Sequence, residues 1–211
     1  MAHVLVIGAS KGIGLETTKA ALAAGHRVRA LARSAAGIGL ADPALEKVRG
    51  DALSSRDIDA ALRGTEVVIQ ALGIAMGDLF RPVTLFSDAT RILVGAMERR
   101  GVKRLICVTG FGAGDSRASI GCLQSVPFRL LVGRAYDDKD VQERLIEASS
   151  LDWTIARPGI LTNGTRTGRY EILVAPSQWR NGLVSRADVA DFLVRQIEDR
   201  THVRTAPVLV Y

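Results

Sequence analysis

The sequence has 211 residues, of which 47% are hydrophobic and 24% charged, and a formal net charge of +6. That length is enough for one α/β domain that buries its core without disulfides, and no apolar run approaches the roughly 18 residues of a membrane helix. The basic residues are scattered, with no Lys/Arg run interleaved with aromatic residues, so the charge indicates neither a nucleic-acid partner nor a membrane partner.

A glycine-rich turn joins the first two predicted elements, a strand over Val4 to Ile7 and a helix from about Ile13 to Ala24. Gly8 permits the turn, Gly12 lets the backbone approach a phosphate, and Gly14 lets the helix pack close to the strand. Free N–H groups at the start of a helix face an anion. The stretch therefore predicts a cradle for a dinucleotide; a tight turn without a ligand is the alternative.

The second strand, His26 to Arg33, ends in a basic residue that is followed by Ser34. In dinucleotide folds a carboxylate here binds the ribose hydroxyls of NAD, whereas an arginine accommodates the extra phosphate of NADP. Lys11 adds a second cation within the glycine loop. We therefore predict NADP(H) in preference to NAD(H). The alternatives are a solvated charge at the strand end and an exposed loop lysine.

Strands and helices alternate through the first half of the chain. The further strands are predicted over Leu45 to Asp51, Glu66 to Gly73 and Lys103 to Gly110, with helices from Ser54 or Ser55 to about Leu62 and from Pro82 to Gly101. This alternation predicts a Rossmann-like, doubly wound parallel sheet with helices on both faces, in a single domain over residues 1–211. Because the carboxyl ends of parallel strands meet at one edge, Gly8, Arg33, Asp51, Gly73 and Thr109 are expected to converge there.

Two stretches carry a family resemblance. The motif Gly8-Ala-Ser-Lys-Gly-Ile-Gly14 resembles the fingerprint of the short-chain dehydrogenase/reductase superfamily. The run from Asp138 to Glu143, with Leu151 to Gly159 after it, is similar to the atypical branch of that superfamily. That branch contains the flavin reductase/biliverdin reductase type and many NAD(P)H-binding proteins.

The resemblance, together with the strand ends, implies a set of cofactor contacts. An acidic residue at Asp51 would lie along the adenine edge, unless it is a turn aspartate, and Lys139 would hold the nicotinamide ribose. The turn Arg157-Pro158-Gly159 would run under the nicotinamide. The predicted cofactor-binding residues are Gly8, Ser10, Lys11, Gly12, Ile13, Arg33, Ser34, Asp51, Ala52, Ala71, Leu72, Gly73, Thr109, Lys139, Pro158, Gly159, Ile160 and Leu161.

The candidate catalytic residues, Thr109, Tyr136 and Lys139, depart from the usual family pattern. Short-chain reductases usually place a Ser or Thr after the fifth strand and a Tyr and a Lys four residues apart, whereas Tyr136 and Lys139 are three apart. Positions three apart still share a helix face, so the pair stays a candidate. The alternatives are a packing tyrosine and, because three aspartates flank it, a solvated lysine.

The end of the chain is predicted to be structural. Ser185 caps a helix whose apolar stripe is Val189, Phe192, Leu193 and Ile197, and residues 206–211 form a last strand at the sheet edge. Two irregular stretches, residues 111–134 and 161–179, are predicted to face the substrate. Their apolar residues Phe128, Leu130, Leu131, Tyr170 and Trp179 would roof a flat substrate, and Arg117, Arg166 and Arg169 would recognise an acid unless they are exposed loop charges.

The remaining signals are weak. Cys107 in a strand and Cys122 in a loop lack the spacing of a metal site or a disulfide framework, so no metal is predicted. No leader precedes the first strand, which favours a cytoplasmic location.

The leading functional hypothesis is an NADPH-dependent oxidoreductase that passes hydride to a planar acceptor such as a flavin, a quinone or a conjugated carbonyl, as a monomer or small homo-oligomer. The alternatives are a non-catalytic NADPH-binding redox sensor and a nucleotide-sugar epimerase or dehydratase. The last normally keeps an intact Tyr-x-x-x-Lys and a larger substrate domain.

Overall fold

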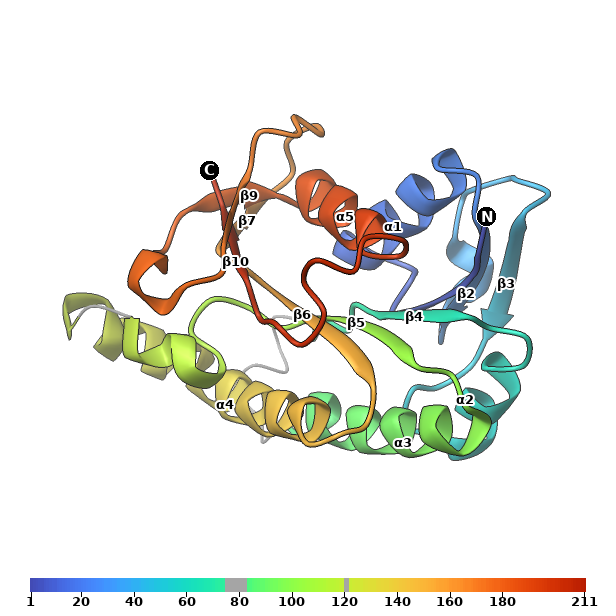
Figure 1. Ribbon diagram of the computed structural model, residues 1–211, viewed down its shortest axis with the longest axis horizontal. Coiled ribbons are helices and arrows are strands. Elements are labelled where there is room, and N and C mark those ends of the chain that lie inside the picture. The colour runs from blue at the N-terminus through green and yellow to red at the C-terminus, as the bar shows by residue number, and fades with distance from the viewer. Residues whose placement is uncertain (75–82, 120–121) are drawn as a thin grey trace.

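The computed structural model describes the chain except residues 75–82 and 120–121, and it describes no side chains over residues 119–132. A twisted sheet forms the middle layer, with α1 and α5 on one face and α2, α3 and α4 on the other (Figure 1). These helices are α1 (Gly12–Ala23), α2 (Ser55–Ala61), α3 (Leu85–Arg100), α4 (Cys122–Glu147) and α5 (Arg186–Arg195). In the described part of the chain, no helix combines the length and apolarity of a membrane span.

The main sheet has eight strands in the order β3-β2-β1-β4-β5-β6-β10-β8, and all neighbours are parallel except β10 and β8. Its strands are β1 (His3–Ile7), β2 (Arg27–Ala32), β3 (Leu45–Arg49), β4 (Val67–Gln70), β5 (Arg104–Val108), β6 (Asp152–Pro158), β8 (Glu171–Leu173) and β10 (Val208–Val210). A second, parallel pair is formed by β7 (Ile160–Thr162) and β9 (Leu183–Ser185). The predicted Rossmann-like fold is confirmed.

The apolar strands are buried on both faces, as expected for a parallel sheet that is covered by helices. Along β1, Val4 and Val6 belong to the core cluster under α1 and α5, whereas Leu5 and Ile7 belong to the cluster on the α2 and α3 side. Successive side chains of a strand point to opposite faces, so one short apolar run anchors both layers.

Two helix ends follow the local sequence as predicted. The Ser185 hydroxyl accepts a hydrogen bond from the backbone N–H of Asp188 and so caps α5. Helix α3 ends at Gly101, whose φ of +69° is the left-handed conformation that favours glycine at this position. The predicted start of that helix at Pro82 lies outside the described residues.

Three predictions about local structure are wrong. The stretch 111–134 is not irregular throughout, because a 3-10 turn (Gly114–Ser119) and then α4 occupy most of it, and Cys122 begins this helix rather than lying in a loop. The stretch 161–179 contains β8. Because β8 pairs with the outer side of β10, the last strand is not at the sheet edge.

Candidate functional site

The ends of the parallel strands bring most of the predicted site residues to one edge of the sheet. Gly8 follows β1, Arg33 follows β2, Ala71 follows β4 and Thr109 follows β5, while Pro158 ends β6. The strand order turns back between β1 and β4, which is where ligands bind in open α/β sheets. The glycine loop after β1 lies at that point.

The glycines of this loop have different surroundings. A Cβ on Gly8, whose φ is +86°, would lie 2.5 Å from the Ala71 carbonyl oxygen, and a Cβ on Gly14 would collide with the Gly8 carbonyl. Among the described residues, a Cβ on Gly12 would meet nothing nearer than the Arg186 Nε, at 3.8 Å. The first two glycines thus close the turn, while Gly12 leaves open space in which a ligand can approach the backbone.

The start of α1 is suited to an anion. No side chain caps this helix, and its first turn holds no acidic residue, so the positive end of the helix dipole is not neutralised by the chain itself. Lys11 is exposed beside it, whereas Ser10 and Ile13 are partly buried. These features fit the phosphates of a dinucleotide.

The residues predicted along the adenosine half lie at the ends of β2, β3 and β4. Arg33 and Ser34 are exposed, and neither Asp51 nor Leu72 is fully buried. The Asp51 carboxylate accepts a hydrogen bond from the Leu53 N–H at 3.0 Å, which is the turn role given above as the alternative. Ala52 and Ala71 are buried, and Gly73 is exposed, with no atom of the described residues within 4 Å of the point where a Cβ on it would stand.

Lys139 points inward rather than along a solvated helix face. Its Nζ donates to the Thr109 carbonyl oxygen at 2.6 Å and lies 5.2 Å and 4.9 Å from the ring centroids of Phe86 and Tyr136. Among the described residues no carboxylate lies within ion-pairing distance of this ammonium. Burial lowers the pKa of Lys139 to about 8.

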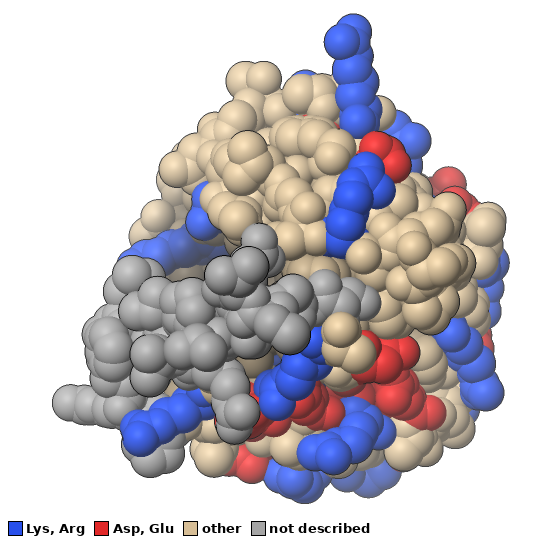
Figure 2. All heavy atoms as spheres, turned by 90° about the vertical axis from the view of Figure 1, so that its left-hand side faces the viewer, with Lys and Arg blue, Asp and Glu red and all other residues tan. Residues whose placement is uncertain are grey.

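The three aspartates around Lys139 have other partners. Asp138 is buried and accepts from the Phe86 N–H at 2.8 Å, so it caps the start of α3 from a neighbouring helix. Asp137 and Asp140 pair with Arg117 at 2.8 Å and 2.9 Å. Acidic and basic side chains intermix on this side of the molecule, below the grey residues in Figure 2, without forming a patch of one sign. Arg117 is thus already paired.

Tyr136 lies against the end of β5. A Cβ on Gly110 would be 2.7 Å from the Tyr136 hydroxyl oxygen and 3.5 Å from the Lys139 Nζ. The absence of a side chain at Gly110 therefore leaves room for the Tyr136 hydroxyl beside Lys139, although these two residues are three apart and not the usual four. Burial, and secondarily the Glu143 carboxylate, raises the pKa of Tyr136 to about 12, so the hydroxyl keeps its proton at neutral pH.

The Thr109 hydroxyl is engaged in a buried polar network. It donates to Glu143 Oε1 at 2.6 Å, and both Glu143 oxygens accept from Arg157, at 3.1 Å and 2.6 Å. Glu143 and the Arg157 guanidinium are each 1% exposed, and Arg157 also pairs with the exposed Asp115 at 2.6 Å. Glu143 ends the run that carries the family resemblance, but the sequence analysis gave it no contact of its own, although its position one helical turn after Lys139 is a usable signal.

The segment predicted to contact the nicotinamide crosses from one sheet to the other. Pro158 is buried in β6, and a Cβ on Gly159 would collide with the Gly182 carbonyl, so the two glycines bring β7 and β9 together. Ile160 and its register partner Leu183 are 57% and 53% exposed. Leu161 packs against the core on the α1 and α5 side.

Most of the described side chains that were expected to face a substrate contact the protein itself. Tyr170 donates to Asp191 at 3.0 Å, and the Trp179 ring lies 5.2 Å from the Arg157 guanidinium carbon. Arg169 is exposed, and Arg166 pairs with Asp191 at 2.7 Å. Phe128, Leu130 and Leu131 lie outside the described side chains.

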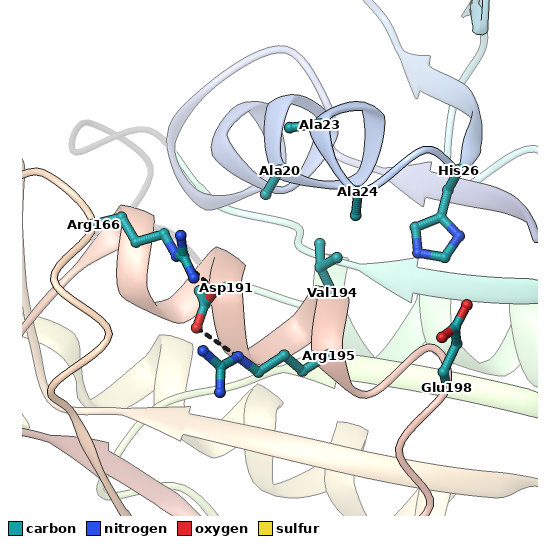
Figure 3. Close-up of a pocket in the computed structure, with 9 residues that line it drawn as sticks. All are labelled: Ala20, Ala23, Ala24, His26, Arg166, Asp191, Val194, Arg195 and Glu198. Carbon is teal, nitrogen blue, oxygen red and sulfur yellow. Dashed lines mark hydrogen bonds and ion pairs between the residues drawn. The ribbon is translucent and has the colours of Figure 1, made fainter. Parts of the chain in front are cut away.

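A surface pocket of about 460 Å³ lies between α1 and α5, away from the glycine loop (Figure 3). Its lining residues are Ala20, Ala23, Ala24, His26, Arg166, Asp191, Val194, Arg195 and Glu198. Arg166 and Arg195 both turn toward Asp191 and form ion pairs with it, at 2.7 Å and 2.9 Å. Of the predicted site residues only Arg166 lines it, so this pocket is separate from the edge described above.

Arg186 is a residue whose position the sequence analysis missed. It was passed over as part of a structural helix, yet its Nε is the nearest atom to the open side of Gly12. The sequence does contain a signal for it. A cation in the first turn of a helix is unfavourable because it opposes the helix dipole, so an arginine at this position indicates a role other than helix stabilisation.

Comparisons with known proteins agree with this geometry. A family model described as NAD(P)H-binding matches residues 8–200. An uncharacterized chloroplastic protein of Arabidopsis thaliana is 28% identical over 200 residues, or 92% of this chain and 71% of that protein. The uncharacterized sugar epimerase YhfK of Bacillus subtilis is 28% identical over 184 residues, or 83% of this chain and 78% of that protein. Among solved structures, ChuY of Escherichia coli O157:H7, an anaerobillin reductase, is 28% identical with a TM-score of 0.81, over 99% of this chain and 96% of that one.

Proposed function

Because the chain belongs to the NAD(P)H-binding family, we propose that it is an NADPH-dependent oxidoreductase that delivers hydride to a planar acceptor, such as a flavin, a quinone or a conjugated carbonyl. The observation that carries this proposal is the meeting of the Lys139 ammonium and the Tyr136 hydroxyl at the end of β5. The name of ChuY, an anaerobillin reductase of similar fold and length, supports a reductase role.

Different residues of the site would bind the cofactor, orient it and donate the proton. The bound nicotinamide supplies the hydride, so the chain needs chiefly to bind, orient and protonate. The open backbone at Gly12 holds the pyrophosphate, and Lys139 holds the nicotinamide ribose. Tyr136 carries a proton on its hydroxyl that it can donate to the acceptor. Because the Thr109 hydroxyl donates to Glu143, Thr109 is a positioning residue in this scheme and not the proton donor.

The acceptor would meet an apolar surface. Ile160 and Leu183 expose aliphatic side chains beside the segment expected at the nicotinamide, which suits a planar ring more than a sugar. We further propose that the protein is cytoplasmic and that it acts as a monomer or a small homo-oligomer.

The direct test is to mix the protein with NADPH and a panel of flavins, quinones and conjugated carbonyls and to follow the absorbance of reduced nicotinamide. We expect acceptor-dependent oxidation above protein-free controls. Tight NADPH binding without turnover on any acceptor would favour the redox sensor, to which the engaged Thr109 hydroxyl also points. Turnover of a nucleotide sugar without net oxidation would favour the epimerase class, which the name of YhfK suggests.

Replacing Arg33 with aspartate tests the preference for NADP. The exposed arginine after β2 would bind the 2′-phosphate, so Arg33→Asp should raise the Kd of NADPH at least about tenfold more than that of NADH. Titration of both cofactors, followed by their fluorescence, measures this. Arg63→Asp, an exposed charge change after α2, is the matched control. Equal losses for the two cofactors would exclude a phosphate contact at Arg33.

A further inference from the structure

We infer that Arg186, at the start of α5, binds the pyrophosphate of the dinucleotide from the side opposite the glycine loop. This inference rests on the proposed cofactor site and adds to it a residue from a distant part of the sequence.

The position of the guanidinium is the first argument. Arg186 Nε lies 3.8 Å from the point where a Cβ on Gly12 would stand, and within the described part of the chain no other heavy atom beyond the neighbours of Gly12 comes as close to that point. Gly12 opens α1, whose first turn lacks both a capping side chain and an acidic residue. A phosphate that sits on this helix start thus has the guanidinium beside it.

The second argument is charge. Arg186 Nη1 donates to the Thr162 carbonyl at 3.2 Å and to Asn163 Oδ1 at 2.7 Å, and both acceptors are neutral. Among the described residues no carboxylate pairs with Arg186. The nearby Asp188 is buried and accepts from Thr167, Ser185 and Tyr211 instead.

A cation in this place is costly unless an anion joins it. Arg186 is the first residue of α5, where the helix dipole repels positive charge, and its side chain is partly buried. The two neutral acceptors hold Nη1 and therefore fix the guanidinium plane. No hydrogen bond from Nε to a described residue is present, which leaves this N–H to face Gly12.

The neighbours of Arg186 indicate which part of the cofactor it meets. One is Gly12, expected under the pyrophosphate, and the other is the end of β7, which continues the segment expected beside the nicotinamide. A group held between them is the phosphate on the nicotinamide side. Both NADPH and NADH carry that phosphate, whereas only NADPH carries the 2′-phosphate assigned to Arg33.

The test is cofactor binding by the full chain carrying Arg186→Gln, measured by the fluorescence of NADPH and NADH. We expect the Kd of both to rise by similar factors, about tenfold or more, since a charge-assisted contact to phosphate is lost. The salt dependence of binding should also become weaker. Arg63→Gln, the same charge change far from the site, should leave both affinities unchanged.

Each other outcome overturns the inference. Unchanged affinities would place Arg186 outside the cofactor site, and a loss confined to NADPH would assign it to the 2′-phosphate. Should Arg186→Gln fail to fold, Arg186→Lys, which keeps the charge but lacks the guanidinium fork, should still weaken both cofactors alike. If the unaltered protein binds neither cofactor, the proposed function itself fails, which is a different result from wild-type binding that Arg186→Gln does not change.

Discussion

Replacing Lys139 with methionine should lower turnover of NADPH by about 100-fold or more at pH 7, because the reacting groups lose the charge that orients them. Methionine keeps an unbranched side chain between the Phe86 and Tyr136 rings, so the packing is retained while the ammonium and its bond to the Thr109 carbonyl are removed. The thermal midpoint of the free protein should not fall. Steady-state kinetics and a thermal melt check the two parts, and unchanged turnover would remove Lys139 from the active site.

The pH profile of the unaltered protein gives an independent check on Lys139. Burial lowers the pKa of this ammonium to about 8, from its usual value of 10.5. The ammonium is therefore charged below about pH 8 and neutral above it, so kcat/KM should fall as the pH rises through this value. In the Lys139→Met variant this fall in kcat/KM near pH 8, the alkaline limb of the profile, should be absent. A limb at the same pH in both proteins would assign it to another group.

Replacing Glu143 with leucine should destabilise the fold by about 3 kcal/mol, because it removes one partner of a buried ion pair. Arg157 would lose the carboxylate that binds two of its nitrogens and would keep the exposed Asp115 as its anionic partner among the described residues, and the Thr109 hydroxyl would lose its acceptor. Unfolding in urea, with the slope compared between variants, measures this loss.

Two control variants test whether the loss of stability comes from leaving a buried charge without its partner. Glu46→Leu breaks the exposed pair with Arg29 and should cost less than about 1 kcal/mol. The double variant Glu143→Leu with Arg157→Met removes both buried charges and should recover much of the lost stability. A loss below about 1 kcal/mol for the single variant would mean that the pair at Glu143 behaves like a surface ion pair.

The sequence was sufficient to predict the sheet and its ligand-binding edge. Short apolar runs that end in glycine are a clear signal when they alternate with helices. The motif from Gly8 to Gly14, together with the run from Asp138 to Gly159, indicated the NAD(P)H-binding family that the match over residues 8–200 confirms. The first part of α4 was missed because it contains Pro127 and Gly133, which are poor helix formers. In the folded chain the helix forms despite this low intrinsic helix propensity. Strand β8 is three residues long and forms only by pairing with β10, a contact that local pattern does not encode.

The candidate site was predictable where a residue follows a strand and not where it reaches the site through tertiary contact. Thr109 and Arg33 belong to the first kind. The bond from Thr109 to Glu143, the pair of Glu143 with Arg157, and the approach of Arg186 to Gly12 join segments far apart along the chain. No spacing rule brings such residues together, because their proximity is a product of the whole fold.

Gly110 makes two positions of the chain interdependent. Its missing side chain is the space into which the Tyr136 hydroxyl fits, so a side chain at position 110 and the present position of this phenol exclude each other. A serine introduced at position 110 would therefore displace the Tyr136 hydroxyl, although Thr109 beside it is accommodated. A variant with a larger residue at position 110 has to be judged together with the residue at position 136.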